Sequence, residues 1–486
     1  MTFRKVRSIA HLALGLAALG CAAEETSVVE PDAGRAPRDT GPAVMDVPVP
    51  TFDVGPLDRP AAEVATEPTD TGPDTPEVSR AMFCEGSGPP VTVGPPGAMR
   101  CAGRLAETVF RYSLCSCSDL GLAGFLRTDS YDSARGMMGR ERGGAVGVNG
   151  NYTIVGYSQI GDTLTSSGIA PLRLVGAHNL DGDFNLGGPL EVVGTLDVAR
   201  NSRIRSNITA LGPMRVRGDL LHQSGALALG VIRVDGRRSS GAVTVDPPCA
   251  CGTGEIFDVA AAVRDAQARN DNADAAFDPT RFNAVLGRQV TTLPCGRFYA
   301  DRVAGLGSVE LRVEGRTALF IGGDFDLGGF FDVQLGPRGE LDVFIAGSVL
   351  GAGYLRMGGA SRPSGVRIYI GGDRGFTLLG ASRFVGNVYA PRAAVTIAGY
   401  MNLHGALFAQ NIITGGDLDV HYDRSILRAG DDCPEEPMPT ACRRCGSCRA
   451  SQACVGGACG VCRTDADCCE PLVCATATGR CESIPP

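Results

Sequence analysis

The chain has 486 residues, and its 53 acidic residues outnumber 45 lysines and arginines to give a net charge of −8 at pH 7. With this balance and without a recognisable RNA- or DNA-binding motif, no nucleic-acid partner is expected. Glycine, at 67 residues, is roughly twice as frequent as in an average protein, and Trp is absent. The length allows about two to four ordinary domains, or one long repetitive body with appendages.

Residues 1–21 predict an export signal. Basic residues between positions 4 and 7 precede an apolar run, Ile9 to Leu19, which is too short to span a membrane as a helix. The run ends in Ala-Leu-Gly-Cys and resembles the signal of bacterial lipoproteins. The resemblance implies that Cys21 is lipidated and anchors the mature chain to a membrane. Cleavage near Ala22, as in an ordinary signal peptide, is the alternative.

Residues 22–80 predict a disordered, acidic, Pro/Thr-rich linker. They contain ten prolines and thirteen acidic residues but only four arginines. Such a segment has too little apolar surface to offset the entropy lost on ordering. It suits a stalk that lifts a folded body away from a membrane.

Two series of related segments follow, and both indicate internal repeats. PLRLVG, PLEVVG and PMRVRG begin at positions 171, 189 and 213. The second series begins at Leu319, Val343, Ile368, Val388 and Leu407, with spacings of 24, 25, 20 and 19 residues. Each unit alternates apolar and polar residues and ends at a glycine or small residue, so one unit cannot bury its apolar face alone.

These repeats predict a mainly β protein whose body is a parallel β-helix or solenoid. Right-handed crossovers are the default for such connections. We expect a first solenoid stack within residues 84–245 and a second within 297–430. A β-sandwich also has short, evenly spaced strands, but the repeated object here is a whole unit rather than a hairpin. In VYAPRAAVTIAG (388–399), the pattern predicts that Val388, Ala390, Val395 and Ile397 point inward, that Pro391 ends a strand and that Gly399 turns a corner.

Residues 246–296 interrupt the repeats and predict a short helical insert flanked by cysteines. Apolar residues from Ile256 to Val263 recur at helical spacing. A second helix is expected from Pro279 to Leu286, with Asp278 as its N-cap. The insert is expected to pack on the side of the coil or over the end of its first stack.

Without Cys21, eighteen cysteines remain in an exported chain, so all are candidates for disulfides. They are Cys84, Cys101, Cys115, Cys117, Cys249, Cys251, Cys295, Cys433, Cys442, Cys445, Cys448, Cys454, Cys459, Cys462, Cys468, Cys469, Cys474 and Cys481. Eleven of them lie within residues 433–486, which predicts a small disulfide-rich module. Some of its spacings also suit zinc, but export and the adjacent Cys468-Cys469 pair favour disulfides.

The pairing within this set stays open at the level of sequence. One economical arrangement places five bridges within the module and uses Cys433 to tie it to the body. A bond from Cys249 or Cys251 to Cys295 would fasten the base of the helical insert. The Cys-x-Cys pairs at 115/117 and 249/251 could suggest redox chemistry, but bonds to separate structural partners are expected instead.

The histidines and acidic residues form no recognised catalytic or metal motif. His404 and His421 are about one coil apart and could stack on one face as a metal pair, but two ordinary surface histidines are expected instead. Acidic pairs at 181/183, 324/326 and 417/419, and the cluster 270–274, follow the preference of Ca²⁺ for oxygen ligands. Roles in turns and helix caps explain them as well. We therefore expect no cofactor, no metal and no catalytic residue.

The segment from Gly386-Asn387-Val388-Tyr389-Ala390-Pro391 to Asp419-Val420-His421-Tyr422-Asp423 resembles a poorly characterised solenoid domain of bacterial surface and pilus-associated proteins. The resemblance covers roughly residues 319–428. The spacing of Cys462, Cys468-Cys469, Cys474 and Cys481 resembles knottin-like and Dickkopf-like modules, which implies a stapled contact or capping unit and no activity.

Together these features predict a surface-exposed, non-enzymatic lipoprotein of the bacterial outer membrane. Its solenoid would serve as a structural or adhesive body with a glycan or protein ligand on its surface. The alternative is a polysaccharide-acting β-helix enzyme, a lyase or hydrolase, whose site would need acidic residues that converge across neighbouring coils.

Overall fold

The computed structural model describes one compact unit within residues 73–486. The residues described are 80–84, 92–93, 100–135, 137–223, 225–350, 355–357, 362–379, 382–429, 448, 452–455, 458–468, 472–476 and 478–482. The predicted signal, Cys21 and nearly all of the predicted linker lie outside these residues, as do Cys433, Cys442, Cys445, Cys469 and the side chain of Cys101.

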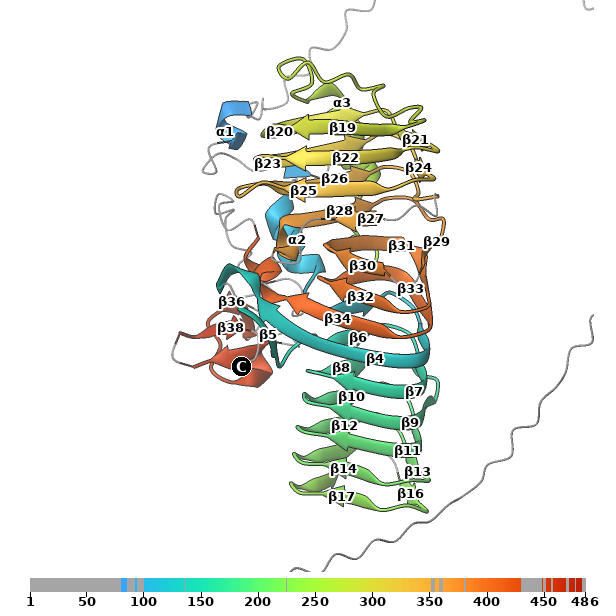
Figure 1. Ribbon diagram of the computed structural model, residues 1–486. Coiled ribbons are helices and arrows are strands. Elements are labelled where there is room, and N and C mark those ends of the chain that lie inside the picture. The colour runs from blue at the N-terminus through green and yellow to red at the C-terminus, as the bar shows by residue number, and fades with distance from the viewer. Residues whose placement is uncertain are drawn as a thin grey trace, which may run out of the picture. The chain divides into compact units, whose positions relative to one another are not determined.

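The body is a parallel β-solenoid in which each coil contributes a strand to each of three faces (Figure 1). The first face consists of β20 (Gly296–Ala300), β23 (Arg316–Ile321), β26 (Glu340–Ile345), β28 (Val366–Ile370), the starts of β31 (Asn387–Ala398) and β33 (Leu407–Gly415), β3 (Leu114–Ser116), β6 (Val146–Val148), β8 (Leu164–Ser166), β10 (Phe184–Leu186), β12 (Ser202–Ile204), β15 (Leu220–His222) and β18 (Arg238–Ser240). The second face consists of β21 (Val303–Gly305), β24 (Phe325–Leu327), β29 (Phe376–Leu379), the ends of β31 and β33, the starts of β4 (Leu120–Asp132), β7 (Tyr152–Ile160), β9 (Leu172–Leu180) and β11 (Leu190–Val198), β13 (Ile208–Ala210) and β16 (Ala226–Ala228). The third face consists of β19 (Arg288–Leu293), β22 (Ser308–Val313), β25 (Phe331–Leu335), β27 (Leu355–Met357), β30 (Ser382–Val385), β32 (Met401–His404), β34 (Leu418–Asp423), the ends of β4, β7, β9 and β11, β14 (Met214–Val216) and β17 (Ile232–Val234). The predicted fold class is confirmed.

The coils form two stacks that meet in the middle of the solenoid (Figure 1). The lower stack starts at β3 in the middle and winds to β18 at one end. The chain then returns along the first face, and the upper stack winds from β19 at the other end back to β34. There β33 and β34 pair in parallel with β3 and β4, so that Leu407 lies beside Leu114 and Leu418 beside Leu126. The last coil of the upper stack therefore pairs with the first coil of the lower stack and not with its last coil.

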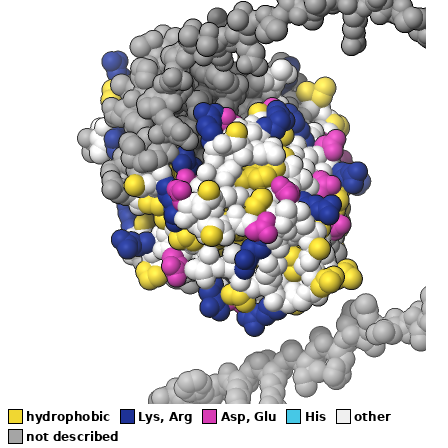
Figure 2. All heavy atoms as spheres, turned by 90° about the horizontal axis from the view of Figure 1, so that it is seen from above, with side chains coloured by type: hydrophobic (Ala, Val, Ile, Leu, Met, Phe, Trp, Pro, Cys, Tyr) yellow, Lys and Arg dark blue, Asp and Glu magenta, His cyan; other side chains and the backbone are white. Residues whose placement is uncertain are grey.

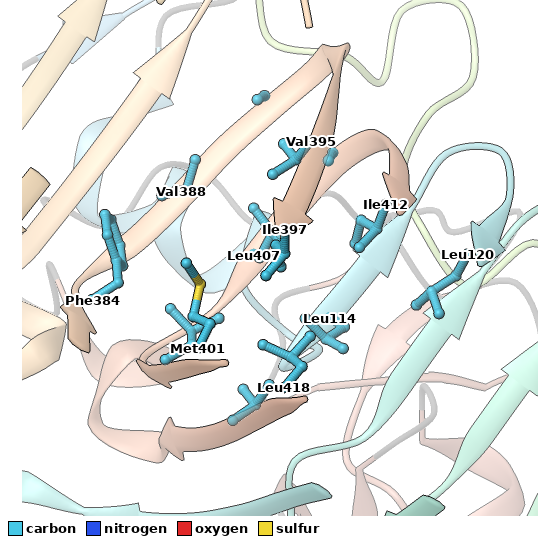
Figure 3. Packing of buried hydrophobic residues seen from close by; sticks show 14 of the residues in the cluster. Leu114, Leu120, Phe384, Val388, Val395, Ile397, Met401, Leu407, Ile412 and Leu418 are labelled. Atoms are coloured by element: carbon cyan, nitrogen blue, oxygen red, sulfur yellow. The ribbon is translucent and has the colours of Figure 1, made fainter. Parts of the chain in front are cut away.

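One apolar core runs through both stacks. Figure 3 shows the junction, where Leu114 and Leu120 of the lower stack lie close to Leu407, Ile412 and Leu418 of the upper stack. All of these side chains are almost completely buried. The hydrophobic core is therefore continuous across the boundary between the stacks.

The pairing register confirms one predicted repeat series and corrects the other. Each first residue of the second series, from Leu319 to Leu407, lies directly beside the next one. In the first series, Leu190 pairs with Leu172 as expected, but its next partner is Ile208 and not Met214. Met214 pairs instead with Leu196 on the third face. PMRVRG thus resembles PLEVVG because both supply alternating strands, but the two lie on different faces.

β31 contains the VYAPRAAVTIAG segment, and its four predicted inward residues are all buried in the core. Pro391 does not end the strand. The register shifts between Ala390 and Ala394, and the strand bends there from the first face to the second. Proline is tolerated at such a bulge because no ladder hydrogen bond is needed from its nitrogen. Gly399 takes a φ of +87° at the next corner, as a glycine readily can.

The helices lie against the first face. They are α1 (Arg80–Cys84), α2 (Ala102–Val109) and α3 (Val259–Ala268). α3 is the predicted first helix of the insert; Asp258 caps it by accepting a bond from the backbone N–H of Ala261 (3.0 Å). It packs on β20, β23 and β26 of the upper stack, on the side of the coil.

The second predicted helix, from Pro279 to Leu286, is wrong, because this segment consists of turns. The Asp278 carboxylate accepts bonds from the N–H and the hydroxyl of Thr280, both 2.8 Å, which closes a local turn instead of capping a helix. Phe277 and Phe282 from this region belong to the solenoid core. Phe277 lies between Phe282 and Phe298 of the first complete upper coil, and the three rings help to close that end of the core. Figure 2 views this end of the molecule, where basic and acidic side chains are interspersed with apolar ones.

The smaller elements complete the described part of the chain. They are β1 (Thr92–Val93) paired with β2 (Arg100–Cys101), β5 (Met137–Glu141) paired with β4, the 3₁₀ turns Ser133–Arg135, Pro363–Gly365, Arg424–Arg428 and Asp465–Asp467, and two hairpins in the tail, β35 (Ala453–Val455) with β36 (Ala458–Gly460) and β37 (Val473–Ala475) with β38 (Arg480–Glu482). Disulfides Cys448–Cys459, Cys462–Cys474 and Cys468–Cys481 staple the tail. Cys454 is also disulfide-bonded. The predicted disulfide-rich C-terminal region is therefore confirmed.

Glycines stack at the corner between the second and third faces, and substitution there tests the coil geometry. A Cβ on Gly156, whose φ is +135°, would lie 2.0 Å from the carbonyl oxygen of Gly124 in the coil above. We expect Gly156→Ala to lower the free energy of unfolding by roughly 3 kcal/mol or more, through steric overlap and backbone strain. Gly121→Ala is the matched control, since a Cβ there would meet nothing within 4 Å. Urea denaturation measures both; equal midpoints for the two variants would contradict this geometry.

Candidate functional site

The first face has an apolar upper half that is covered by other elements. Phe320, Phe344, Tyr369, Tyr389 and Phe408 occupy one outward row in register. Neighbouring ring centroids are 4.9, 4.7, 6.1 and 4.9 Å apart. α2, α3 and the segment before α3 pack on this row and form a second core. The Tyr389 hydroxyl also accepts a bond from the N–H of Phe257 (3.1 Å), which explains the Tyr of the V-Y-A-P segment.

The same row becomes polar in the lower half, and a groove lies there. Phe408 is followed by Cys115 and Gly147, and then by Thr165, Asn185 and Arg203 on successive coils. The returning segment 244–252 lies opposite this row, and the end of α2 also lines the groove, whose volume is about 750 Å³. This volume falls within the usual range for ligand sites, roughly 300–1,000 Å³.

Two disulfides fix the wall of the groove to its floor. Cys115 pairs with Cys249, and Cys117 pairs with Cys251. Asn149 adds a double hydrogen bond, because its amide both donates to the carbonyl and accepts from the N–H of Cys249, each at 2.9 Å. The expectation that each Cys-x-Cys pair bonds to separate partners is confirmed.

The suggested bond from Cys249 or Cys251 to Cys295 is wrong. Cys295 pairs with Cys84, beside which Arg80 donates to the Cys295 carbonyl oxygen (2.9 Å). The physical reason is distance along the solenoid: the returning chain passes the middle of the body at Cys249, whereas Cys295 lies in the first coil of the upper stack.

The charges that line the groove are balanced. Arg111 and Arg203 supply two positive charges, and Asp246 and Glu255 supply two negative ones. Glu255 already accepts a bond from the N–H of Gly252 (2.8 Å). Backbone groups, hydroxyls and amides make up much of the remaining polar surface, which suits an uncharged polar ligand better than a nucleic acid or a strongly acidic one.

The disulfide-rich tail borders the groove. Cys468 is among the lining residues, and Asp465 approaches Arg200 of the lower stack with 3.6 Å between carboxylate and guanidinium. Both partners of this ion pair are substantially exposed, so it contributes little to stability. The tail therefore contacts the body at the edge of the candidate site.

The His-Tyr-Asp segment at the end of the upper stack joins the two stacks. The Nδ1 atom of His421 lies 2.6 Å from the carboxylate of Asp129 in the first lower coil. His404 and His421 are in register with ring centroids 4.7 Å apart and are both partly buried, so the expected ordinary surface positions are wrong and the two rings stack. Burial, with the nearby His421 and Arg383, lowers the pKa of His404 to about 4. The Tyr422 hydroxyl donates to the carbonyl of Phe110 (2.6 Å).

Asp423 lies at the centre of a buried network that superficially resembles a hydrolase site. Its carboxylate accepts bonds from the N–H groups of Ser133, Ser364 and Ser425 and from the hydroxyls of Ser133 and Ser425, at 2.7–3.1 Å. The Asp423 side chain has no exposed surface. Each serine hydroxyl is therefore held in place for structure, and the network ties the 3₁₀ turns of both stacks together.

The acidic pairs connect successive coils. Carboxylates of Asp183, Asp324 and Asp417 accept the N–H of Asn201, Ser348 and Phe125, each one coil away, at 2.7–3.2 Å. The predicted turn role is right in kind, although the acceptor serves the neighbouring coil and not its own turn.

The cluster at 270–274 is used in the same structural way. Asp271 forms a double ion pair with Arg297 at 2.9 and 3.0 Å, and Asn272 bonds with the backbone of Tyr299. The best-placed oxygens for Ca²⁺ are therefore occupied by protein donors. Among the described residues, the three metal-ligand side chains that converge are Cys462, Cys468 and Cys481, and disulfides engage all of them.

Sequence reasoning did not identify the groove residues Thr165, Asn185 and Arg203. Their signal is weak but present: they recur at intervals of 20 and 18 residues, where the equivalent upper positions are aromatic. Thr165 and Asn185 are still buried at 3% exposure each, and Arg203 is the first exposed residue of the three.

Comparison with known proteins finds one family model that matches part of the chain. Residues 253–429 match the model of a domain of unknown function (DUF7305). This range contains α3 and the whole upper stack but not the lower stack. No curated protein and no solved structure matches the chain. No helix in the described part of the chain is long and apolar enough to cross a membrane.

Asp162, in the turn that leads to groove strand β8, provides a test by pH. Its side chain is 4% exposed, and burial raises the pKa of the carboxyl from 3.8 to about 7, against hydrogen bonds from Thr163 and the charge of Arg200. The folded protein therefore holds this proton more tightly than the unfolded chain does. Its contribution to stability is present below pH 4 and is lost as the pH rises through 7.

We expect the stability of wild type relative to Asp162→Asn to fall by up to about 4 kcal/mol between pH 4 and pH 8. The asparagine keeps an oxygen acceptor for Thr163 and does not titrate. Urea unfolding of both proteins across this range measures the difference. A difference that stays constant with pH would rule out a buried, neutral Asp162.

Proposed function

We propose that the protein is an exported, lipid-anchored binding protein that displays a rigid solenoid on the outside of a bacterial cell. The groove beside the polar half of the first face is proposed as its ligand site. The ligand is an uncharged glycan or the surface of another protein. The observation that carries the proposal is this groove, which has a fixed, disulfide-tied wall and a balanced set of charges.

The rigidity of the body supports a role in display. Backbone hydrogen bonds connect coil to coil across the junction of the two stacks, and disulfides tie the N-terminal segment and the returning segment to the body. Disulfides on this scale form in oxidising compartments and so support export. The lipoprotein-like signal and the acidic linker would place this body away from the membrane, on a stalk.

The side chains that could act in catalysis are engaged in structural contacts, and this supports binding over catalysis. His421 is engaged by Asp129, and the hydroxyls of Ser133 and Ser425 both donate to the Asp423 carboxylate. Within the described groove, Asp246 and Glu255 are the acidic residues. A β-helix lyase or hydrolase needs convergent acids or a base with a metal, whereas Glu255 is already engaged by the backbone of the groove wall.

Replacement of Arg203 by a bulky residue tests whether the groove binds the ligand. The full-length lipidated protein in detergent is applied to arrays of oligosaccharides and of cell-surface proteins. We expect at least one ligand to be retained without being converted, and Arg203→Trp to weaken it about tenfold or more, because a ring would occupy the groove. Arg205→Trp, on an exposed side chain of the same coil that does not line the groove, is the control. Conversion of a bound glycan that stops with EDTA would overturn the non-enzymatic proposal.

Lipidation at Cys21 tests the anchor. Cells that express the protein are labelled with radioactive or alkyne-tagged palmitate. Wild type is expected to carry the label and to fractionate with the outer membrane, whereas Cys21→Ser is expected to lose both. Ala22→Ser, beside the lipidation site, controls for general effects on the signal. Equal labelling of Cys21→Ser and wild type would contradict the proposed anchor.

A further inference from the structure

A second surface lies on the third face, at the junction of the two stacks. We name it the junction surface: Phe125, Arg127, Tyr157, Asn179, Tyr400 and Asp419. Its aromatic residues differ from most others in the described chain, whose rings are buried in the two cores. Tyr400 of the upper stack is 46% exposed, and Phe125 and Tyr157 of the lower stack are half-buried.

Phe125 and Tyr157 form a short ladder of aromatic rings that ends abruptly. The two residues are in register, with ring centroids 5.0 Å apart and ring planes that differ by 1°. The next residues in this row are Ala177 and then Thr195. Because parallel strands are about 4.8 Å apart, a ring in the next coil would continue the stack. Ala177 offers only a methyl group there, too small to cover the outer face of the Tyr157 ring.

A row of polar side chains runs beside the aromatic ladder and is held by mutual contacts. Arg127 and Asp419 form an ion pair at 2.6 Å, and the Tyr400 hydroxyl donates to the same carboxylate (3.2 Å). Asn179 donates from its amide to the Tyr157 hydroxyl (3.2 Å). The charges of Arg127 and Asp419 compensate each other, so this surface does not select a charged ligand.

Three polar atoms in this row make no hydrogen bond to a described residue. The Nε atom of Arg127, the Oδ1 atom of Asp419 and the Oδ1 atom of Asn402 are buried and have no hydrogen-bond partner among the described residues. Asn402 lies in register with Asp419, which in turn lies beside Arg127. These three atoms are inaccessible at the surface, so they lower stability and do not contribute to ligand binding.

We infer that the junction surface binds an uncharged chain of pyranose sugars. One face of a pyranose ring presents C–H groups, which pack on an aromatic side chain, while its hydroxyls lie at the rim. Stacking a sugar ring on the outer face of Tyr157, over Ala177, fills the place of the missing ring. The amide of Asn179, on the strand that carries Ala177, and the Tyr157 hydroxyl then lie beside its hydroxyls as donor and acceptor. This inference rests on the proposed binding function and names the ligand class.

Calorimetry with cellohexaose, maltohexaose and chitohexaose tests the inference on the full-length protein in detergent. We expect at least one hexaose to bind, and the double variant Phe125→Ala/Tyr157→Ala to bind it about tenfold more weakly or worse. Tyr157→Phe retains the ring and should bind within about threefold of wild type. Leu211→Ala, an exposed apolar residue in the turn after β13, is the control. Tyr400→Ala, at the exposed edge, replaces the double variant if that protein does not fold.

The outcomes separate this inference from the proposed function. Loss of hexaose binding in the aromatic variants, with Arg203→Trp unaffected, supports the junction surface. Loss in Arg203→Trp, with the aromatic variants unaffected, places the sugar in the groove and overturns this inference while the proposed function holds. Failure of all three hexaoses to bind also overturns it, and the array experiment then decides the proposed function independently.

Discussion

The parallel pairing of β33 and β34 with β3 and β4 is the contact on which the rest of the molecule depends. It joins strands that lie far apart in the chain: Arg127 and Asp419, which form an ion pair across it, are 292 residues apart. Without it, each stack would end in unpaired N–H and C=O groups over an open apolar core. The chain thus builds one long solenoid from two shorter ones, and it protects both inner ends by joining them.

This joint also explains the residues of the His-Tyr-Asp segment, which could be mistaken for a catalytic motif. His421 contacts a lower-stack carboxylate, Tyr422 reaches the end of α2, and Asp423 collects the N–H groups of turns from both stacks. Each residue connects to a different part of the chain. A buried carboxylate with five donors is strongly stabilised only when every donor is in place, so the network favours one arrangement of the joint.

The local pattern of the sequence was sufficient to predict the coils but not their order. Alternating residues and spacings from Leu319 to Leu407 predicted the solenoid and the register of the upper stack, because each pairing lies one coil away. Every parallel rung presents the same pattern, so nothing local indicates that the rung at Leu407 pairs with Leu114. The helix expected from Pro279 failed for a similar reason, since the same Asp278 can cap a helix or close a turn.

The groove was beyond prediction because its floor, its wall and its edge come from three distant segments. The only sign of the groove in the sequence is the change from aromatic to polar residues along one row, and this sign was not recognised.

That change in polarity determines where binding can occur. In the upper half of the first face, aromatic rings attract α3 and the segment before it, and the face is buried. At Cys115 the row turns polar, and two disulfides hold the returning segment to the floor of the groove. Thr165 and Asn185 line the groove but are buried, whereas Arg203 is exposed. The match to the family model covers the buried half with its helix, whereas the coils that form the floor lie outside it. Ligand binding through the groove, as proposed, then depends mainly on coils outside the matched range. The junction surface differs, because Tyr400 and Asp419 come from the matched domain and Phe125 and Tyr157 do not. A sugar bound there would depend on both stacks and therefore on the joint itself.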